Sequence, residues 1–96
     1  MHKVVINSCY DGFWLSDIAR NWLREHYNIS NFEELPRHDY RLVECVEVLG
    51  DKANSIISKL KIIEIEGRIY IIDEYDGKET VIEPDNINWI IINPNE

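Results

Sequence analysis

The feature that most constrains this fold is a change in hydrophobic spacing near residue 60. The segment before it carries apolar residues at the spacing of one helix face, namely Leu42, Cys45, Val46 and Leu49. The segment after it carries isoleucine-rich runs separated by two turn signals, Glu66-Gly67 and Asp76-Gly77. An Asp-Gly pair between such runs favours a hairpin, because glycine supplies the positive φ that the turn needs. We therefore predict strands at 61–66, 68–74 and 78–83, and a last strand at 88–93.

The amino-terminal half predicts one strand followed by two or three helices. The consecutive Val4, Val5 and Ile6 are typical of a strand covered on both faces, here residues 3–7. Ser16 is a good N-cap for a helix over Asp17–Tyr27, which Asn28 can end. Asp39 can cap a second helix. That helix is either bent at Gly50 or followed by a third short helix with Ala53, Ile56, Ile57 and Leu60 on its apolar face.

These elements predict a single α+β domain over residues 1–96 with the order β-α-α-β-β-β-β. Two helices, or three if Gly50 divides the second, are expected to pack on one face of a mainly antiparallel sheet. The last strand is apolar on both faces around Trp89, Ile90, Ile91 and Ile92. It is therefore either central in the sheet or a contact with another chain, such as a second copy in a homodimer.

The net charge of −8 either serves solubility alone or favours a particular class of partner. Residues 60–96 hold nine acidic side chains against three basic ones. Such a surface repels phosphate backbones and disfavours direct nucleic-acid binding, whereas it suits a basic protein partner. The predicted partner-binding residues are those around the second turn, Asp73, Glu74, Asp76 and Glu79. Their spacing does not match a calcium loop, so we expect no metal there, and a solvated hairpin tip is the alternative explanation.

The loop before the first helix is a second candidate site. It brings Tyr10, Asp11, Gly12, Phe13 and Trp14 up to the capping Ser16. Backbone N–H groups at a helix start suit an anion, and the aromatic side chains could stack on a base. The segment contains neither a P-loop nor a dinucleotide fingerprint, and the aromatics could instead close the core beneath the loop.

The cysteines indicate neither a zinc site nor a catalytic thiol. Cys9 and Cys45 belong to no CxxC or CxxH pair, and no spacing links Cys9 to His2, His26 or His38. We expect reduced thiols and no cofactor. The sequence also shows no signal peptide and no membrane span, which favours the cytoplasm.

The chain resembles a family of small uncharacterised proteins encoded by bacteriophages and giant DNA viruses. The matching segments are KVVINxCYGGFGLS at Lys3 to Ser16, VExLGxxAN from Val46 to Asn54, LKIxEI at Leu60 to Ile65, and an IxEYDGxExV hairpin at Ile72 to Val81. Asp11 and Trp14 stand where that family carries glycine, and the basic residues that usually precede the final tryptophan are missing before Trp89. The resemblance implies a viral origin and a compact α+β fold, but no mechanism.

Three functions remain open at this point. The first is a non-enzymatic viral accessory protein that binds a protein partner through its acidic surface, in the host cytoplasm or in the virion. The second is a binder, or sponge, of a small nucleotide-like ligand at the 9–16 loop. The third, an enzyme, has the least support in the sequence.

Overall fold

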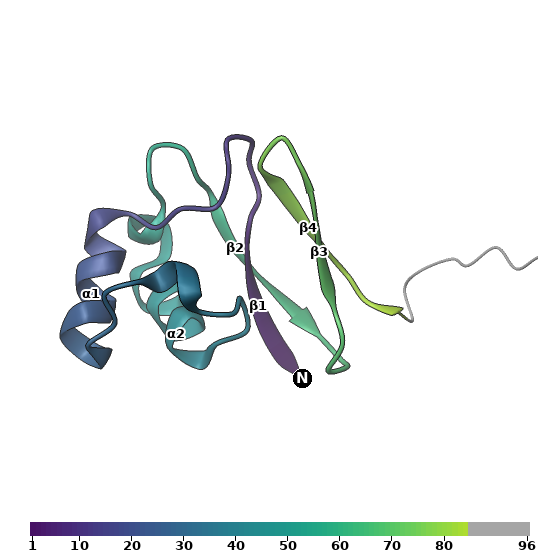
Figure 1. Ribbon diagram of the computed structural model, residues 1–96, viewed down its shortest axis with the longest axis horizontal. Coiled ribbons are helices and arrows are strands. Elements are labelled where there is room, and N and C mark those ends of the chain that lie inside the picture. Colours follow the sequence, from purple (N-terminus) through teal and green to yellow (C-terminus); the bar gives the residue numbers. More distant parts are fainter. Residues whose placement is uncertain (85–96) are drawn as a thin grey trace, which may run out of the picture.

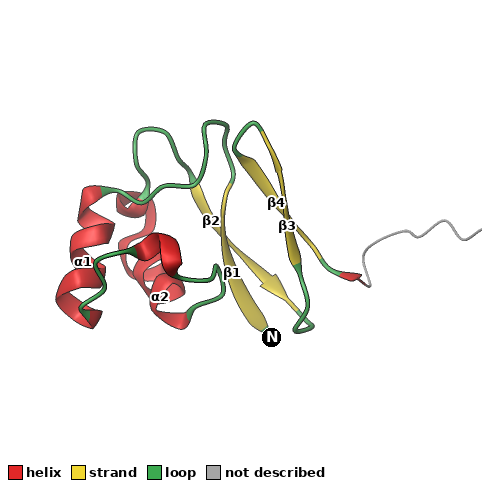
Figure 2. Ribbon diagram, in the orientation of Figure 1, coloured by secondary structure: helices red, strands yellow, loops and turns green. Residues whose placement is uncertain are grey.

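The described part of the chain, residues 1–84 of a computed structural model, forms three layers around a central pair of strands. Strand β1 (His2–Asn7) pairs antiparallel with β2 (Leu60–Ile65). Strands β3 (Ile71–Tyr75) and β4 (Lys78–Ile82) form a separate antiparallel hairpin. The helices lie on one side of the β1–β2 pair and the β3–β4 hairpin lies on the other (Figures 1 and 2). The α+β class is confirmed.

Both long helices begin at the predicted caps. The Ser16 hydroxyl accepts the N–H of Ala19 at 3.1 Å and starts α1 (Asp17–Tyr27), which ends at Asn28 with a left-handed φ of 55°. The Asp39 carboxylate accepts the N–H of Arg41 at 2.9 Å and starts α2 (Tyr40–Leu49). The same carboxylate is also paired with the Arg41 guanidinium, which lowers the pKa of Asp39.

The two faces of β1 belong to two different hydrophobic clusters, as its run of apolar residues predicts. Val5 packs with the helices, in a cluster that includes Leu15, Leu23, Leu42 and Cys45. Val4 and Ile6 face the other way and pack with Ile65 and with side chains of the β3–β4 hairpin, Ile72 and Val81. The middle layer therefore holds the two outer layers together.

The expected third helix is wrong beyond Ala53. The chain forms a short 3₁₀ helix, η2 (Gly50–Ala53), and then a turn in which Ile56 is fully exposed. Polar side chains take up the backbone groups that a helix would use. Ser58 Oγ accepts the N–H of Ser55 at 3.0 Å, and Asn54 Oδ1 accepts the N–H of Leu60 at 2.7 Å. A second short 3₁₀ helix, η1 (Phe32–Glu34), lies between α1 and α2.

The expected single sheet is also corrected. Among the strands of residues 1–84, β2 pairs with β1 and not with β3, and β3 pairs with β4. The linker at 66–70 lets the hairpin fold across the β1–β2 pair, where Tyr70, Ile72 and Val81 cover its second apolar face. The predicted last strand, with its contact residues Trp89 to Ile92, lies outside the described residues.

Candidate functional site

The edge of β1 that faces away from β2 is covered by two residues, Arg37 and Glu79. Arg37 accepts the Val5 N–H through its backbone oxygen at 2.9 Å, and its Nη1 lies 3.4 Å from the Val5 oxygen. The next amide on this edge, that of Asn7, donates to Glu79 Oε1 at 2.8 Å. Strand β4 thus reaches β1 through a carboxylate and not through a ladder of backbone bonds.

Arg37 and Glu79 form a bidentate ion pair that is largely buried. The two N–O distances are 2.6 and 2.9 Å, and the Glu79 side chain is only 7% exposed. The Arg37 guanidinium also lies 3.6 Å from the ring centre of Phe13, a cation–π contact. The expectation that Glu79 lies on the acidic surface is therefore corrected, because its carboxylate is used inside the fold.

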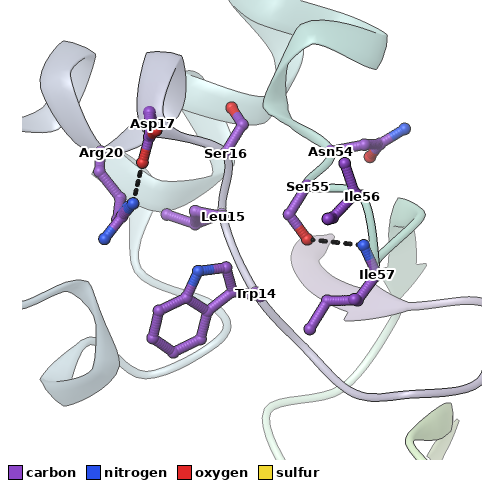
Figure 3. A pocket seen from close by; sticks show the side chains of 9 residues that line it. All are labelled: Trp14, Leu15, Ser16, Asp17, Arg20, Asn54, Ser55, Ile56 and Ile57. Carbon is purple, nitrogen blue, oxygen red and sulfur yellow. Dashed lines mark hydrogen bonds and ion pairs between the residues drawn. The ribbon is translucent and has the colours of Figure 1, made fainter.

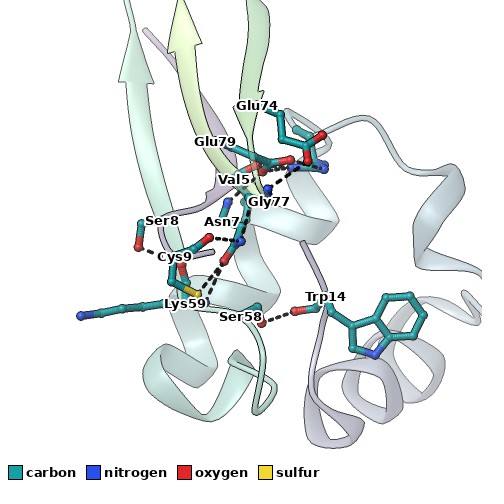
Figure 4. Close-up of polar contacts among 11 residues, drawn as sticks. Val5, Asn7, Ser8, Cys9, Trp14, Ser58, Lys59, Glu74, Gly77 and Glu79 are labelled. Carbon is teal, nitrogen blue, oxygen red and sulfur yellow. Dashed lines mark hydrogen bonds and ion pairs between the residues drawn. The ribbon is translucent and has the colours of Figure 1, made fainter. Parts of the chain in front are cut away.

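Asn7 fixes the end of β1 with a fully used side chain. Its Nδ2 donates to the backbone oxygens of Cys9 at 2.6 Å and Gly77 at 2.7 Å. Its Oδ1 accepts the N–H of Lys59 at 2.9 Å and lies 3.4 Å from the Cys9 thiol. Figure 4 shows these bonds converging on one buried amide. Because both donors and both acceptor positions are used, Asn7 joins three segments at one point.

The tip of the β3–β4 hairpin lies directly on the opening loop. Asp76 and Gly77 both have positive φ, at 50° and 89°, as the Asp-Gly signal predicts. The Asp11 N–H donates to the Asp76 oxygen at 2.9 Å. A Cβ added to Gly77 would lie 2.2 Å from the nitrogen of Gly12, so the two backbones are in close contact. Asp11 itself has a φ of 88°, in the left-handed region that favours glycine.

This contact brings Tyr10 and Asp11 of the predicted ligand site beside Asp76 of the predicted partner site. Together with Tyr75, which belongs to neither prediction, they form one exposed surface that we call the acidic tip. Tyr10 is 54% and Tyr75 73% exposed, and both aspartates are exposed. Lys78 lies between the two tyrosines. It is opposite Tyr75 in the hairpin, and its Nζ is 5.7 Å from the centre of the Tyr10 ring.

Two further carboxylates border the tip on β3. Asp73 is exposed and shares the outer face of that strand with Tyr75. Glu74 is exposed on the other face, where its Oε1 accepts the N–H of Gly77 at 3.0 Å.

The remaining loop aromatics pack inward. Phe13 and Trp14 both contact Phe32, at ring-centre distances of 6.2 and 5.1 Å, and both are only partly exposed. They join the helix-side cluster, which agrees with the alternative that they close the core. Gly12 serves the hairpin contact, so the predicted ligand site at 10–16 is divided between the tip and the helix side.

A groove of about 490 Å³ lies beside the start of α1, between Trp14 and the exposed Ile56 and Ile57 (Figure 3). Ser16 and Arg20 also line it. The Ser16 hydroxyl already donates to the Lys52 oxygen at 2.6 Å while it caps the helix, and Arg20 is paired with Asp17. The groove is therefore mainly an apolar surface, with few polar groups free to orient a ligand.

Neither cysteine has the surroundings of a nucleophile. The Cys9 thiol lies 3.4 Å from Asn7 Oδ1 and 3.4 Å from the Ile57 oxygen, and neither group is a base. Cys45 is buried, and burial with a smaller contribution from Glu44 raises the pKa of its thiol to about 11. Within residues 1–84, no three His, Cys, Asp or Glu side chains gather where they could hold a metal ion. No helix in that range is long and apolar enough to span a membrane.

The sequence matches no protein-family model, and no curated protein or solved structure shows significant similarity to it. The site is therefore interpreted from its own residues. Two of its main residues, Asn7 and Arg37, were not expected from the sequence. Asn7 could have been identified from the sequence, because it is a polar residue that ends an otherwise apolar strand. Arg37 could not, because its partner Glu79 is 42 residues away in the sequence.

Glu79→Gln tests the burial of the ion pair. The amide keeps an acceptor for the Asn7 N–H but leaves the Arg37 charge without a counter-ion. We expect a loss of roughly 2–3 kcal/mol in the free energy of unfolding, measured by urea denaturation. The matched control Asp73→Asn, on the exposed face of the same hairpin, is expected to stay within about 0.5 kcal/mol. Equal effects of the two changes would contradict the assignment.

Gly77→Ala tests the contact between the hairpin tip and the opening loop. The new Cβ would overlap the Asp11 and Gly12 backbone at a positive φ, so we expect a loss of about 2 kcal/mol or more in unfolding free energy. Gly67 in the 66–70 linker is the control, because a Cβ there meets nothing within 4 Å and its φ is not positive. A Gly77→Ala protein as stable as Gly67→Ala would show that the tip does not dock.

Proposed function

We propose that this protein is a non-enzymatic binding protein that holds a basic protein segment on the acidic tip. The observation that carries the proposal is the docking of the hairpin on the opening loop. This docking places Tyr10 and Asp11 beside Asp76, with Tyr75 on the same end of the hairpin. Exposed tyrosines offer large, rigid contact areas, and they are enriched among the residues that dominate binding energy in interfaces.

The charge around the tip favours a basic partner. Asp11, Asp73, Glu74 and Asp76 are exposed there against a single lysine, Lys78. Surface carboxylates mainly raise the rate of association with a positively charged partner and select against an acidic one. The tyrosine rings can in addition take arginine or lysine side chains in cation–π contacts. Glu79 is buried and does not belong to this surface, but the four exposed carboxylates still make it acidic.

The resemblance to phage and giant-virus proteins supports an accessory role for this binding protein in an infected cell. Under this proposal it acts in the host cytoplasm, with the virion as an alternative location. The proposal requires no cofactor and no catalytic residue.

A peptide selection tests the proposed function. Random peptides displayed on a surface are selected on the wild-type protein, and we expect the recovered sequences to be rich in lysine and arginine. Asp11→Asn combined with Asp76→Asn removes two tip charges while keeping side chains that tolerate a positive φ. We expect this variant to lose at least about tenfold in affinity for the recovered peptides, by fluorescence anisotropy at low salt.

The matched control for that selection is Glu25→Gln combined with Glu34→Gln. Both glutamates are exposed, lie on the helix side and change the net charge by the same amount. The control variant is expected to bind the peptides like the wild type. Peptides without basic residues, or an equal loss in both variants, would contradict binding at the tip.

A second candidate is a small nucleotide-like ligand in the groove beside α1. The observation that favours it is the indole of Trp14 on the groove wall, with the Arg20 guanidinium 5.7 Å from its ring. A bound ligand at a hundredfold excess over its dissociation constant would stabilise the fold by about 2.7 kcal/mol. Thermal-shift screening against nucleosides and nucleotides checks this, and a shift that persists in Trp14→Leu would exclude the groove.

A further inference from the structure

A small cavity lies at the end of the β3–β4 hairpin opposite the acidic tip. Its volume is about 220 Å³, and it is lined by His2 at the start of β1, His38 before α2, and Arg68 and Tyr70 in the linker to β3. The buried Ile65 at the end of β2 completes the lining. Three separate parts of the chain thus bring two imidazoles, a guanidinium and a phenol around one cavity.

Tyr70 and His38 are held in place by each other and by the core. The Tyr70 hydroxyl is 2.7 Å from His38 Nδ1, and the rings meet edge to face with centres 5.7 Å apart. The Tyr70 ring packs against the cluster of Val4, Ile6 and Ile65. Burial raises the pKa of Tyr70, although Arg37 opposes the effect, so the phenol remains a hydrogen-bond donor at neutral pH. The bond uses Nδ1 of His38 and leaves its Nε2 for a ligand.

The lining carries one permanent positive charge, that of Arg68, in a chain whose net charge is −8. Among the described residues, no carboxylate lines the cavity and none forms an ion pair with Arg68. The charged groups on either side of His38 are paired outside the cavity, Arg37 with Glu79 and Asp39 with the Arg41 guanidinium. Glu66 lies two residues before Arg68, but it is exposed and is not among the residues that line the cavity. A negative ligand would therefore meet a guanidinium that forms no ion pair within residues 1–84.

We propose that this cavity binds the phosphate group of a small phosphorylated molecule. A guanidinium presents paired N–H donors that match phosphate oxygens, and the imidazole Nε2 of His38, oriented by Tyr70, adds a further donor. The cavity is smaller than the 300–1,000 Å³ or so that drug-sized ligands occupy, so it suits one phosphate with the rest of the molecule outside. The net charge of −8 disfavours a polynucleotide as the source of that phosphate. This site is separate from the acidic tip and does not depend on its function.

Amide chemical shifts of the ¹⁵N-labelled protein, followed during titration with inorganic phosphate at constant ionic strength, test the proposal. We expect saturable shifts at His38, Arg68 and Tyr70, and none at Trp14 or Ile56. Arg68→Gln is expected to weaken binding by about tenfold or more, because a charge-assisted contact is lost. The control Arg24→Gln, an exposed arginine on α1, removes the same charge far from the cavity and is expected to leave binding unchanged.

Adenosine 5′-monophosphate and adenosine then separate phosphate recognition from base recognition. We expect the monophosphate to shift the same amides and adenosine to shift none of them. Linear, unsaturated shifts at tens of millimolar phosphate would overturn the proposal. So would equal binding by Arg68→Gln and Arg24→Gln, or shifts that map to the groove beside Trp14. The spectrum of each variant also shows whether it is folded.

Discussion

The structure depends on how the free edge of β1 is closed. A strand edge presents unpaired N–H and C=O groups that invite another strand, and proteins usually cover them. Here Arg37 satisfies both backbone groups of Val5, and Glu79 accepts the N–H of Asn7. The carboxylate and guanidinium then neutralise each other. Because Arg37 and Glu79 occupy the free edge of β1, the β3–β4 hairpin does not pair with β1 there. It packs across the β1–β2 pair instead.

The closure of the β1 edge determines which residues are exposed at the tip of the β3–β4 hairpin. Glu79 holds β4 against β1, and Asn7 binds the Gly77 oxygen from the end of the same strand. The turn at Asp76 is therefore held on Asp11, and two loops distant in sequence become one surface. A binding surface gains affinity when it is ordered before the partner arrives, because less conformational entropy is lost. The buried polar contacts below the tip thus support the function proposed for the exposed residues above it.

Local patterns predicted the local structure well. Ser16, Asp39 and the Asp76-Gly77 pair each identify an element boundary, because capping and turn chemistry depend on neighbours in sequence. The partly buried Trp14 was open between two interpretations, and packing against Phe32 favours the core. The burial of Glu79 could not be predicted from the sequence. Glu79 and Glu74 are both glutamates of the same hairpin, and the difference between them is that Glu79 forms an ion pair with Arg37. The partner of β2 and the exposure of Ile56 likewise depend on long-range pairing and on competing serine side chains.

The central claim is that the hairpin tip and the opening loop form one ordered surface. Nuclear Overhauser effects between the Hα protons of Gly77 and the amide protons of Asp11 and Gly12 test it most directly, because Gly77 lies against both residues. The account predicts strong cross-peaks in the free protein, before any partner is added. Their absence, in a protein that still shows the cross-peaks of the β1–β2 pair, would contradict it.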